Sequence, residues 1–92
     1  MRIAVLGAGK IGSAIIKGIK GKYEVIATGR SDETLRRIKE LGVEGTKDNK
    51  LAVEKSDIII ISVKPQHFKS LYSSIGNEVW KGKKIVSIMA GV

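Results

Sequence analysis

Three glycines near the start of the chain have the spacing of a loop that binds phosphate groups. The segment from Gly7 to Gly12 (GAGKIG) follows an apolar run and precedes a stretch with helical periodicity. In that setting the first glycine permits a tight turn, the second lets a pyrophosphate approach the backbone, and the third allows close packing of helix and strand. Free amides at the helix start also favour anions. The motif therefore predicts a dinucleotide site, and a turn that only reverses the chain is the alternative.

A second candidate site follows about 20 residues after the glycines, where a free ribose 2′-hydroxyl is usually held by Asp or Glu. No acid stands there, because Ala27 to Ser31 reads ATGRS. A guanidinium binds a phosphate bidentately, whereas a carboxylate would repel it. Arg30 and Ser31 therefore predict NADP as the cofactor, with NAD possible; the alternative is that Arg30 is an exposed loop residue. Arg36 and Arg37 are expected on a solvated helix face.

The third candidate is the loop after a run of four isoleucines. In open parallel sheets, ligands bind beyond the carboxyl ends of the strands. Ser62 and Val63 are expected to present backbone groups to a ribose, and Lys64 either steers phosphates or faces water. Pro65 fixes φ and can begin a helix. His67, the only histidine, is interpreted as a surface or capping residue.

Strands and helices must alternate to bring these loops together. Apolar runs predict strands over residues 2–6, 23–28, 43–45, 57–62 and 84–88, and helical periodicity predicts helices over 11–19, 32–41, 49–55 and 68–75. This order specifies a parallel sheet with helices on both faces. The predicted class is α/β, a Rossmann-like doubly wound sheet of about five strands. The isoleucine run predicts a central strand covered on both faces.

Length and the number of predicted strands point to an incomplete domain. The chain has 92 residues, which allows one small domain. Five strands are fewer than the six of a full dinucleotide fold. Residues 1–92 are therefore interpreted as a truncated N-terminal dinucleotide-binding domain.

The composition excludes several classes of protein. With no Cys and one His, a disulfide scaffold, a thiol nucleophile and a metal site are not expected. The formal net charge of +8 favours an anionic partner, although a solvated basic surface explains it equally well. Nucleic-acid binding is not expected, because the basic turn at 81–84 lacks interleaved aromatic residues. No apolar run is long enough for a membrane span or a signal peptide, so a soluble cytoplasmic protein is expected.

Together these motifs resemble the pyrroline-5-carboxylate reductases. The specific parts are VKPQ, from Val63 to Gln66, and SIMAGV, from Ser87 to Val92, and the resemblance covers the whole chain. It implies that the full protein transfers a hydride from NADPH or NADH to the ring imine of 1-pyrroline-5-carboxylate, which forms proline. It also implies a helical second domain, absent here, that forms a homo-oligomer and holds the substrate.

The resemblance also implies a set of cofactor-binding residues, and no catalytic residue in this chain. The set is Gly7, Ala8, Gly9, Lys10, Ile11 and Gly12 at the pyrophosphate, Arg30 and Ser31 at the 2′-phosphate, Asn49 at the adenosine, and Ser62, Val63, Lys64, Pro65, Met89, Ala90 and Gly91 along the nicotinamide ribose. Lys10 and Met89 depart from the family, which usually has Asn and Ala at these positions. Lys10 adds a charge near the pyrophosphate.

Two other functions remain open from the sequence. A small NAD(P)-binding module can serve as a regulatory or sensor domain without chemistry, because a fold does not determine function. The chain is also compatible with the N-terminal domain of another NADP-dependent reductase, acting on prephenate, a β-hydroxyacid or a deazaflavin. As part of a pyrroline-5-carboxylate reductase, the 92 residues alone are expected to be inactive.

Overall fold

The computed structural model describes residues 1–63 and 65–88, in which strands and helices alternate along the chain. The strands are β1 (Arg2–Leu6), β2 (Glu24–Thr28), β3 (Glu44–Thr46), β4 (Ile58–Ile61) and β5 (Lys84–Ser87), and the helices are α1 (Lys10–Ile19), α2 (Asp32–Glu40), α3 (Asn49–Glu54), α4 (Pro65–Ile75) and α5 (Asn77–Trp80). All the predicted elements are present. The short helix α5 was not predicted from the sequence.

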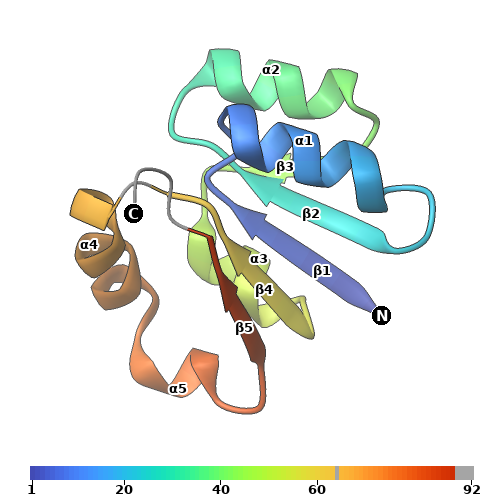
Figure 1. The fold of residues 1–92 in the computed structure, drawn as a ribbon. Helices are drawn as coiled ribbons and strands as arrows, with labels where there is room; N and C mark the ends of the chain where they lie inside the picture. The colour runs from blue at the N-terminus through green and yellow to red at the C-terminus, as the bar shows by residue number, and fades with distance from the viewer. Residues whose placement is uncertain (64, 89–92) are drawn as a thin grey trace.

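The five strands form one parallel sheet in the order β3-β2-β1-β4-β5. In the register of the sheet, Val5 of β1 lies beside Ala27 of β2 and Ile60 of β4. The chain builds outward from β1 in one direction through β2 and β3, and in the other through β4 and β5 (Figure 1). The predicted doubly wound α/β fold is therefore confirmed, and its strand order reverses between β1 and β4, where open sheets bind ligands.

The sheet separates two apolar cores. Helices α1 and α2 cover one face, and α3, α4 and α5 lie on the other (Figure 1). Val5, Ile16 and Ile38 belong to the first core, and all three are fully buried. Leu6 and Ile59 belong to the second, together with residues of α3 to α5. None of the described helices is long and apolar enough to cross a membrane.

The buried face of α1 differs from the one predicted. The i, i+3, i+4 spacing of Ile11, Ala14 and Ile15 predicts that all three face the core, but Ile11 and Ala14 are exposed, Ile11 by 42%. Ile16 is the fully buried residue. The face is rotated because Gly12 lies against the turn after β1, and Ile16 follows it by about one helical turn.

The covering of β4 is also less complete than predicted. Ile59 and Ile61 are fully buried under α3 and α4, but Ile58 and Ile60 on the other face are only half-buried. On that same face of the neighbouring strand, Val86 is 41% exposed. Helices α1 and α2 lie over β1 and β2 and leave this half of the sheet partly open (Figure 1). The predicted central position of β4 is therefore confirmed, and its covering is complete on one face and partial on the other.

Candidate functional site

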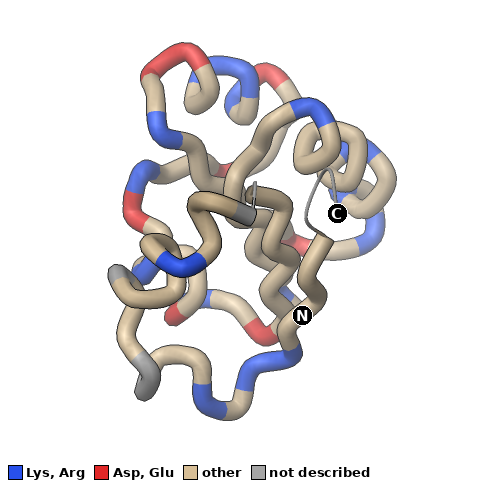
Figure 2. The backbone as a smooth tube through the Cα atoms, turned by 60° about the vertical axis from the view of Figure 1, so that its left-hand side comes forward, with Lys and Arg blue, Asp and Glu red and all other residues tan. Residues whose placement is uncertain are grey.

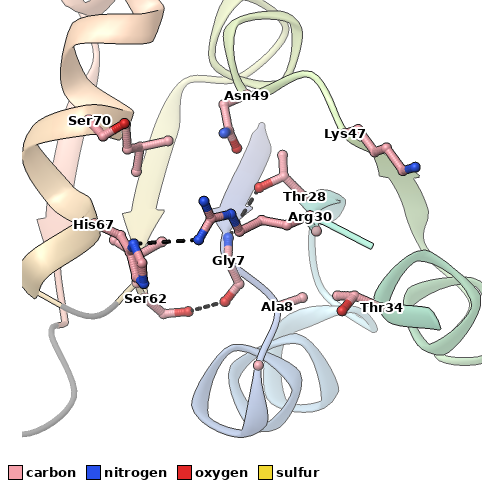
Figure 3. Close-up of a pocket in the computed structure, with 14 residues that line it drawn as sticks. Gly7, Ala8, Thr28, Arg30, Thr34, Lys47, Asn49, Ser62, His67 and Ser70 are labelled. Carbon is pink, nitrogen blue, oxygen red and sulfur yellow. Dashed lines mark hydrogen bonds between the residues drawn. The ribbon is translucent and has the colours of Figure 1, made fainter. Parts of the chain in front are cut away.

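A cavity of about 370 Å³ lies at the carboxyl ends of β1, β2 and β4, beside the point where strand order reverses. Seven of the residues predicted for the cofactor line it: Gly7, Ala8, Gly9, Arg30, Asn49, Ser62 and Val63. They come from four separate segments of the sequence, and the fold brings them together around one space (Figure 3).

Seven further residues line the cavity and were not predicted as site residues from the sequence. They are Thr28, Gly29, Thr34, Lys47, His67, Ser70 and Leu71. Thr28 and Gly29 directly precede Arg30, so both could have been predicted as site residues from their place at the end of β2. The others lie on helices or loops whose placement against the glycine turn depends on the tertiary fold.

The glycine turn is held in place by the strands on either side of β1. The Gly7 amide donates to Thr28 Oγ1 at 3.1 Å, and the Ala8 amide donates to the Thr28 carbonyl at 2.9 Å. Ser62, directly after β4, donates from its Oγ to the Gly7 carbonyl at 2.6 Å (Figure 3). Gly7 has φ +84°, a conformation that glycine adopts without strain. These hydrogen bonds, together with the conformation of Gly7, define the shape of the turn.

The three glycines of the motif have different physical requirements. A Cβ at Gly7 would lie 2.6 Å from the Val63 side chain, and one at Gly12 would lie 2.7 Å from the Gly7 carbonyl oxygen. A Cβ at Gly9 meets nothing within 4 Å, and its φ of −79° is open to any residue. The fold thus requires glycine at the first and third positions. At the second position, which lines the cavity, it leaves an open space against the backbone.

Gly12→Ala is expected to lower the free energy of unfolding by about 1–3 kcal/mol, because the new methyl group clashes with backbone that cannot easily move. Gly18→Ala is the matched control, since the same change in the same helix meets no atom within 4 Å. It should raise stability by roughly 0.5–1 kcal/mol. Urea unfolding of both variants measures the difference, and equal effects would contradict this assignment.

The amino end of α1 has free amides beside the glycine turn. The first backbone amides of a helix have no partner within it, and Gly9, at the N-cap, has no side chain to accept from them. The side chains of Ser31 and Asp48 do cap α2 and α3. The amides of the first turn of α1, with their partial positive charge, fit a pyrophosphate. Lys10 and Ile11 are exposed and do not line the cavity, so their predicted contacts remain predictions.

Arg30 extends across the cavity toward α4. Its Nη1 lies 3.4 Å from Nδ1 of His67, and Figure 3 shows the guanidinium in the middle of the site. Within the described part of the chain, no carboxylate pairs with Arg30. His67 was predicted as a surface or capping residue, and the structure adds that this partly exposed side chain lines the cavity and contacts Arg30.

A second basic residue on the cavity has an acidic partner. Lys47 Nζ lies 2.8 Å from Asp32 Oδ1. The hydrogen bond from Lys47, and then its charge, hold the pKa of Asp32 below its ordinary value of 3.8. A carboxyl with a lowered pKa stabilises the fold at neutral pH, and this contribution is lost as the pH falls through that pKa. Lys47 thus has a carboxylate partner, whereas Arg30 lines the cavity without one among the described residues.

Ser31 serves the fold directly. Its Oγ caps α2 by accepting from the Thr34 amide at 3.2 Å. The same oxygen lies 3.0 Å from Thr34 Oγ1. Ser31 does not line the cavity, so its predicted contact with a 2′-phosphate remains a prediction. Asn49 is the first residue of α3 and does line the cavity, on the side of β2 and β3.

Four predicted site residues lie outside the described part of the chain: Lys64, Met89, Ala90 and Gly91. Pro65 begins α4, as the sequence predicted.

Across residues 1–63 and 65–88 no group of three or more His, Cys, Asp or Glu is arranged to hold a metal ion. Figure 2 shows Lys and Arg spread over several helices and loops instead of along one element.

A protein family described as "NADP oxidoreductase coenzyme F420-dependent" matches residues 2–91 of the chain. The pyrroline-5-carboxylate reductase of Methanosarcina acetivorans is 40% identical to it, over 99% of this chain and 36% of that protein. This relative confirms the resemblance predicted from the motifs. The chain spans about a third of the length of this curated relative.

Solved structures share the fold of the whole chain. An imine reductase from Myxococcus stipitatus in complex with NADP⁺ has a TM-score of 0.85 and 25% identity, over 99% of this chain and 32% of that one. A pyrroline carboxylate reductase from Plasmodium falciparum with NADP bound has a TM-score of 0.78 and 25% identity, over 100% of this chain and 34% of that one.

Proposed function

The chain belongs to the family of coenzyme F420-dependent NADP oxidoreductases, and from that premise we propose that it is the NADP-binding part of a pyrroline-5-carboxylate reductase. One observation carries the cofactor half of this proposal. The glycine turn, with open space at Gly9, lines the same cavity as Arg30 at the end of the next strand. That combination suits a dinucleotide with a 2′-phosphate. The relative from Methanosarcina acetivorans supports the substrate half.

Each group of cavity residues has a distinct part in holding the cofactor. The turn around Gly9 and the first amides of α1 bind the pyrophosphate. Arg30 binds the 2′-phosphate, and Asn49 lies on the adenosine side. Ser62 fixes the turn through its bond to the Gly7 carbonyl and, with Val63, borders the nicotinamide side. When bound, the cofactor supplies the hydride, and the protein contributes position and exclusion of water.

The proposed reaction needs a second part of the protein to hold the imine and its carboxylate. The relative is about three times as long as this chain. On β5, Ile85 is 44% and Val86 41% exposed, so both faces of this edge strand carry apolar side chains in contact with water. Exposed apolar surface of this kind suits a contact with further protein. We place the substrate site and the contacts between subunits in that second part.

The 92-residue chain alone is expected to bind NADPH and to show no NADPH oxidation dependent on pyrroline-5-carboxylate. A chimera tests the rest of the proposal: the chain replaces the matching amino-terminal third of the Methanosarcina acetivorans reductase. The chimera should oxidise NADPH when the imine is added, and a Gly9→Val chimera is the inactive control.

Each outcome bears on a different part of the proposal. Turnover by the isolated chain would show that the substrate is held within these residues. A folded chimera that binds NADPH but does not reduce the imine would contradict the assignment to this reaction. A chain that binds neither NADPH nor NADH would contradict the cofactor site itself.

A further inference from the structure

His67 and Arg30 face each other across the cavity from segments 37 residues apart. Arg30 follows β2 and His67 lies in the first turn of α4, so the contact joins elements on opposite sides of the glycine turn (Figure 3). Both side chains line the space assigned to the cofactor. The sequence provides no second histidine that could serve in its place.

The hydrogen bond between the two side chains depends on which nitrogen of the imidazole carries the proton. A guanidinium has only donors and stays charged, so it can hydrogen-bond Nδ1 of His67 only when that nitrogen carries no proton. A protonated imidazole at 3.4 Å from Arg30 Nη1 would place two cations together. An anion between the two side chains reverses this preference, because it attracts both charges.

We propose that His67 is a second residue that reads the 2′-phosphate of NADP, opposite Arg30. This inference rests on the proposed cofactor function. On binding, Arg30 turns from Nδ1 of His67 to the phosphate, Nδ1 takes a proton from solvent, and the imidazolium donates to a phosphate oxygen. Recognition of the 2′-phosphate is thereby coupled to the uptake of one proton, whereas NADH, which lacks that phosphate, has no such coupling.

The charges around His67 favour this arrangement. Arg30 approaches from the β2–α2 connection, and Lys47, paired with Asp32, lines the same cavity from the β3–α3 connection. On its own helix, Lys69 is exposed. No carboxylate is among the described residues that line the cavity, so an added anion would be the acidic partner of the imidazolium.

The test compares NADPH and NADH binding by calorimetry for the 92-residue chain and for His67→Gln. At about pH 6 the variant should lose roughly 3- to 10-fold in NADPH affinity and almost nothing in NADH affinity. Lys69→Gln removes a positive charge from the same helix outside the cavity and is the matched control. It should leave the ratio of the two affinities unchanged at moderate salt.

The pH dependence separates a charge interaction from packing. Histidine changes charge between about pH 5 and 8, so the loss caused by His67→Gln should shrink toward none at pH 8. The 2′-phosphate titrates in the same range, with a second pKa of about 6. The difference between the unaltered chain and His67→Gln therefore gives the part of the pH dependence of NADPH affinity that is due to His67. Titrations in two buffers with different ionisation enthalpies should show proton uptake with NADPH that is smaller in the variant.

Three results would overturn the inference: no change in NADPH affinity, an equal loss for NADH, or a loss that does not depend on pH. Circular dichroism establishes that each variant is folded. Failure of the proposed function looks different, because the unaltered chain would then bind neither cofactor. His67→Lys provides a further check, since a permanent cation should keep the NADPH preference at pH 8.

Discussion

Gly9→Val is expected to abolish binding of both NADPH and NADH while the chain remains folded. The fold has room for this side chain, because a Cβ at Gly9 meets no atom within 4 Å and the backbone is extended there. The side chain would occupy the place of the pyrophosphate, which both cofactors share. Loss of two charge-assisted hydrogen bonds, each worth about 1.5–3 kcal/mol, corresponds to a loss of affinity of more than about 100-fold.

Gly21→Val is the matched control for this variant. Gly21 also has open space around it, but it lies in the turn between α1 and β2 and does not line the cavity. It should leave both affinities unchanged. If calorimetry shows unchanged NADPH affinity for a folded Gly9→Val chain, the cofactor site has been misplaced.

Arg30→Ala is expected to weaken NADPH binding by about 10- to 150-fold and to leave NADH affinity nearly unchanged. A charge-assisted hydrogen bond from Arg to phosphate is worth about 1.5–3 kcal/mol, and each 1.4 kcal/mol is a factor of ten. Arg30 is exposed and has no acidic partner in the described part of the chain, so it is available to the phosphate. The variant should therefore erase most of a preference for NADPH.

Two controls accompany this measurement: a salt series and a variant of a second arginine, Arg37. The preference of the unaltered chain for NADPH over NADH should decrease as the salt concentration rises, because Arg30 lies in a solvent-exposed loop. Arg37→Ala removes the same charge from the exposed side of α2 and should change neither affinity at moderate salt. Equal losses of NADPH and NADH in Arg30→Ala would mean that this residue does not read the 2′-phosphate. A chain that prefers NADH would contradict the interpretation of the whole loop.

The order of elements and the central loops could be predicted because the signals are local. Runs of β-branched residues, helical periodicity and the glycine turn each lie within a short stretch of sequence. Ser and Asp are residue types that favour N-caps, and Ser31 and Asp48 cap α2 and α3 in the structure. Gly7, Gly9 and Arg30 follow the ends of β1 and β2, which lie side by side, so the sheet itself brings them to one cavity.

What could not be predicted depends on contacts between distant segments. The rotation of α1 follows from the fit of Gly12 against the Gly7 carbonyl and Ser62, 50 residues away in the sequence. The partial exposure of Ile58 and Ile60 follows from where α1 and α2 lie on the sheet, which periodicity along one strand does not encode.

His67 is the clearest case of a residue whose position the sequence could not reveal. The predicted helix began one residue after it, at 68, whereas in the structure His67 lies in the first turn of α4, and its side chain lines the cavity because α4 packs beside β4 with that face toward Arg30. A lone histidine at a helix start does not indicate, from the neighbouring sequence, whether its side chain faces a cavity. Lys47 is similar, since its link to Asp32 joins the start of α2 to the loop after β3.

The central claim is that the cavity at the carboxyl ends of β1, β2 and β4 is an NADP site. Titration of the ¹⁵N-labelled chain with NADP⁺, followed by NMR, tests it directly. Amide shifts should change at Gly9, in the first turn of α1 and at Arg30, and should not change around a second cavity at the opposite ends of the strands, beside Tyr23 and Val43. Unchanged shifts, or changes confined to the second cavity, would contradict the account.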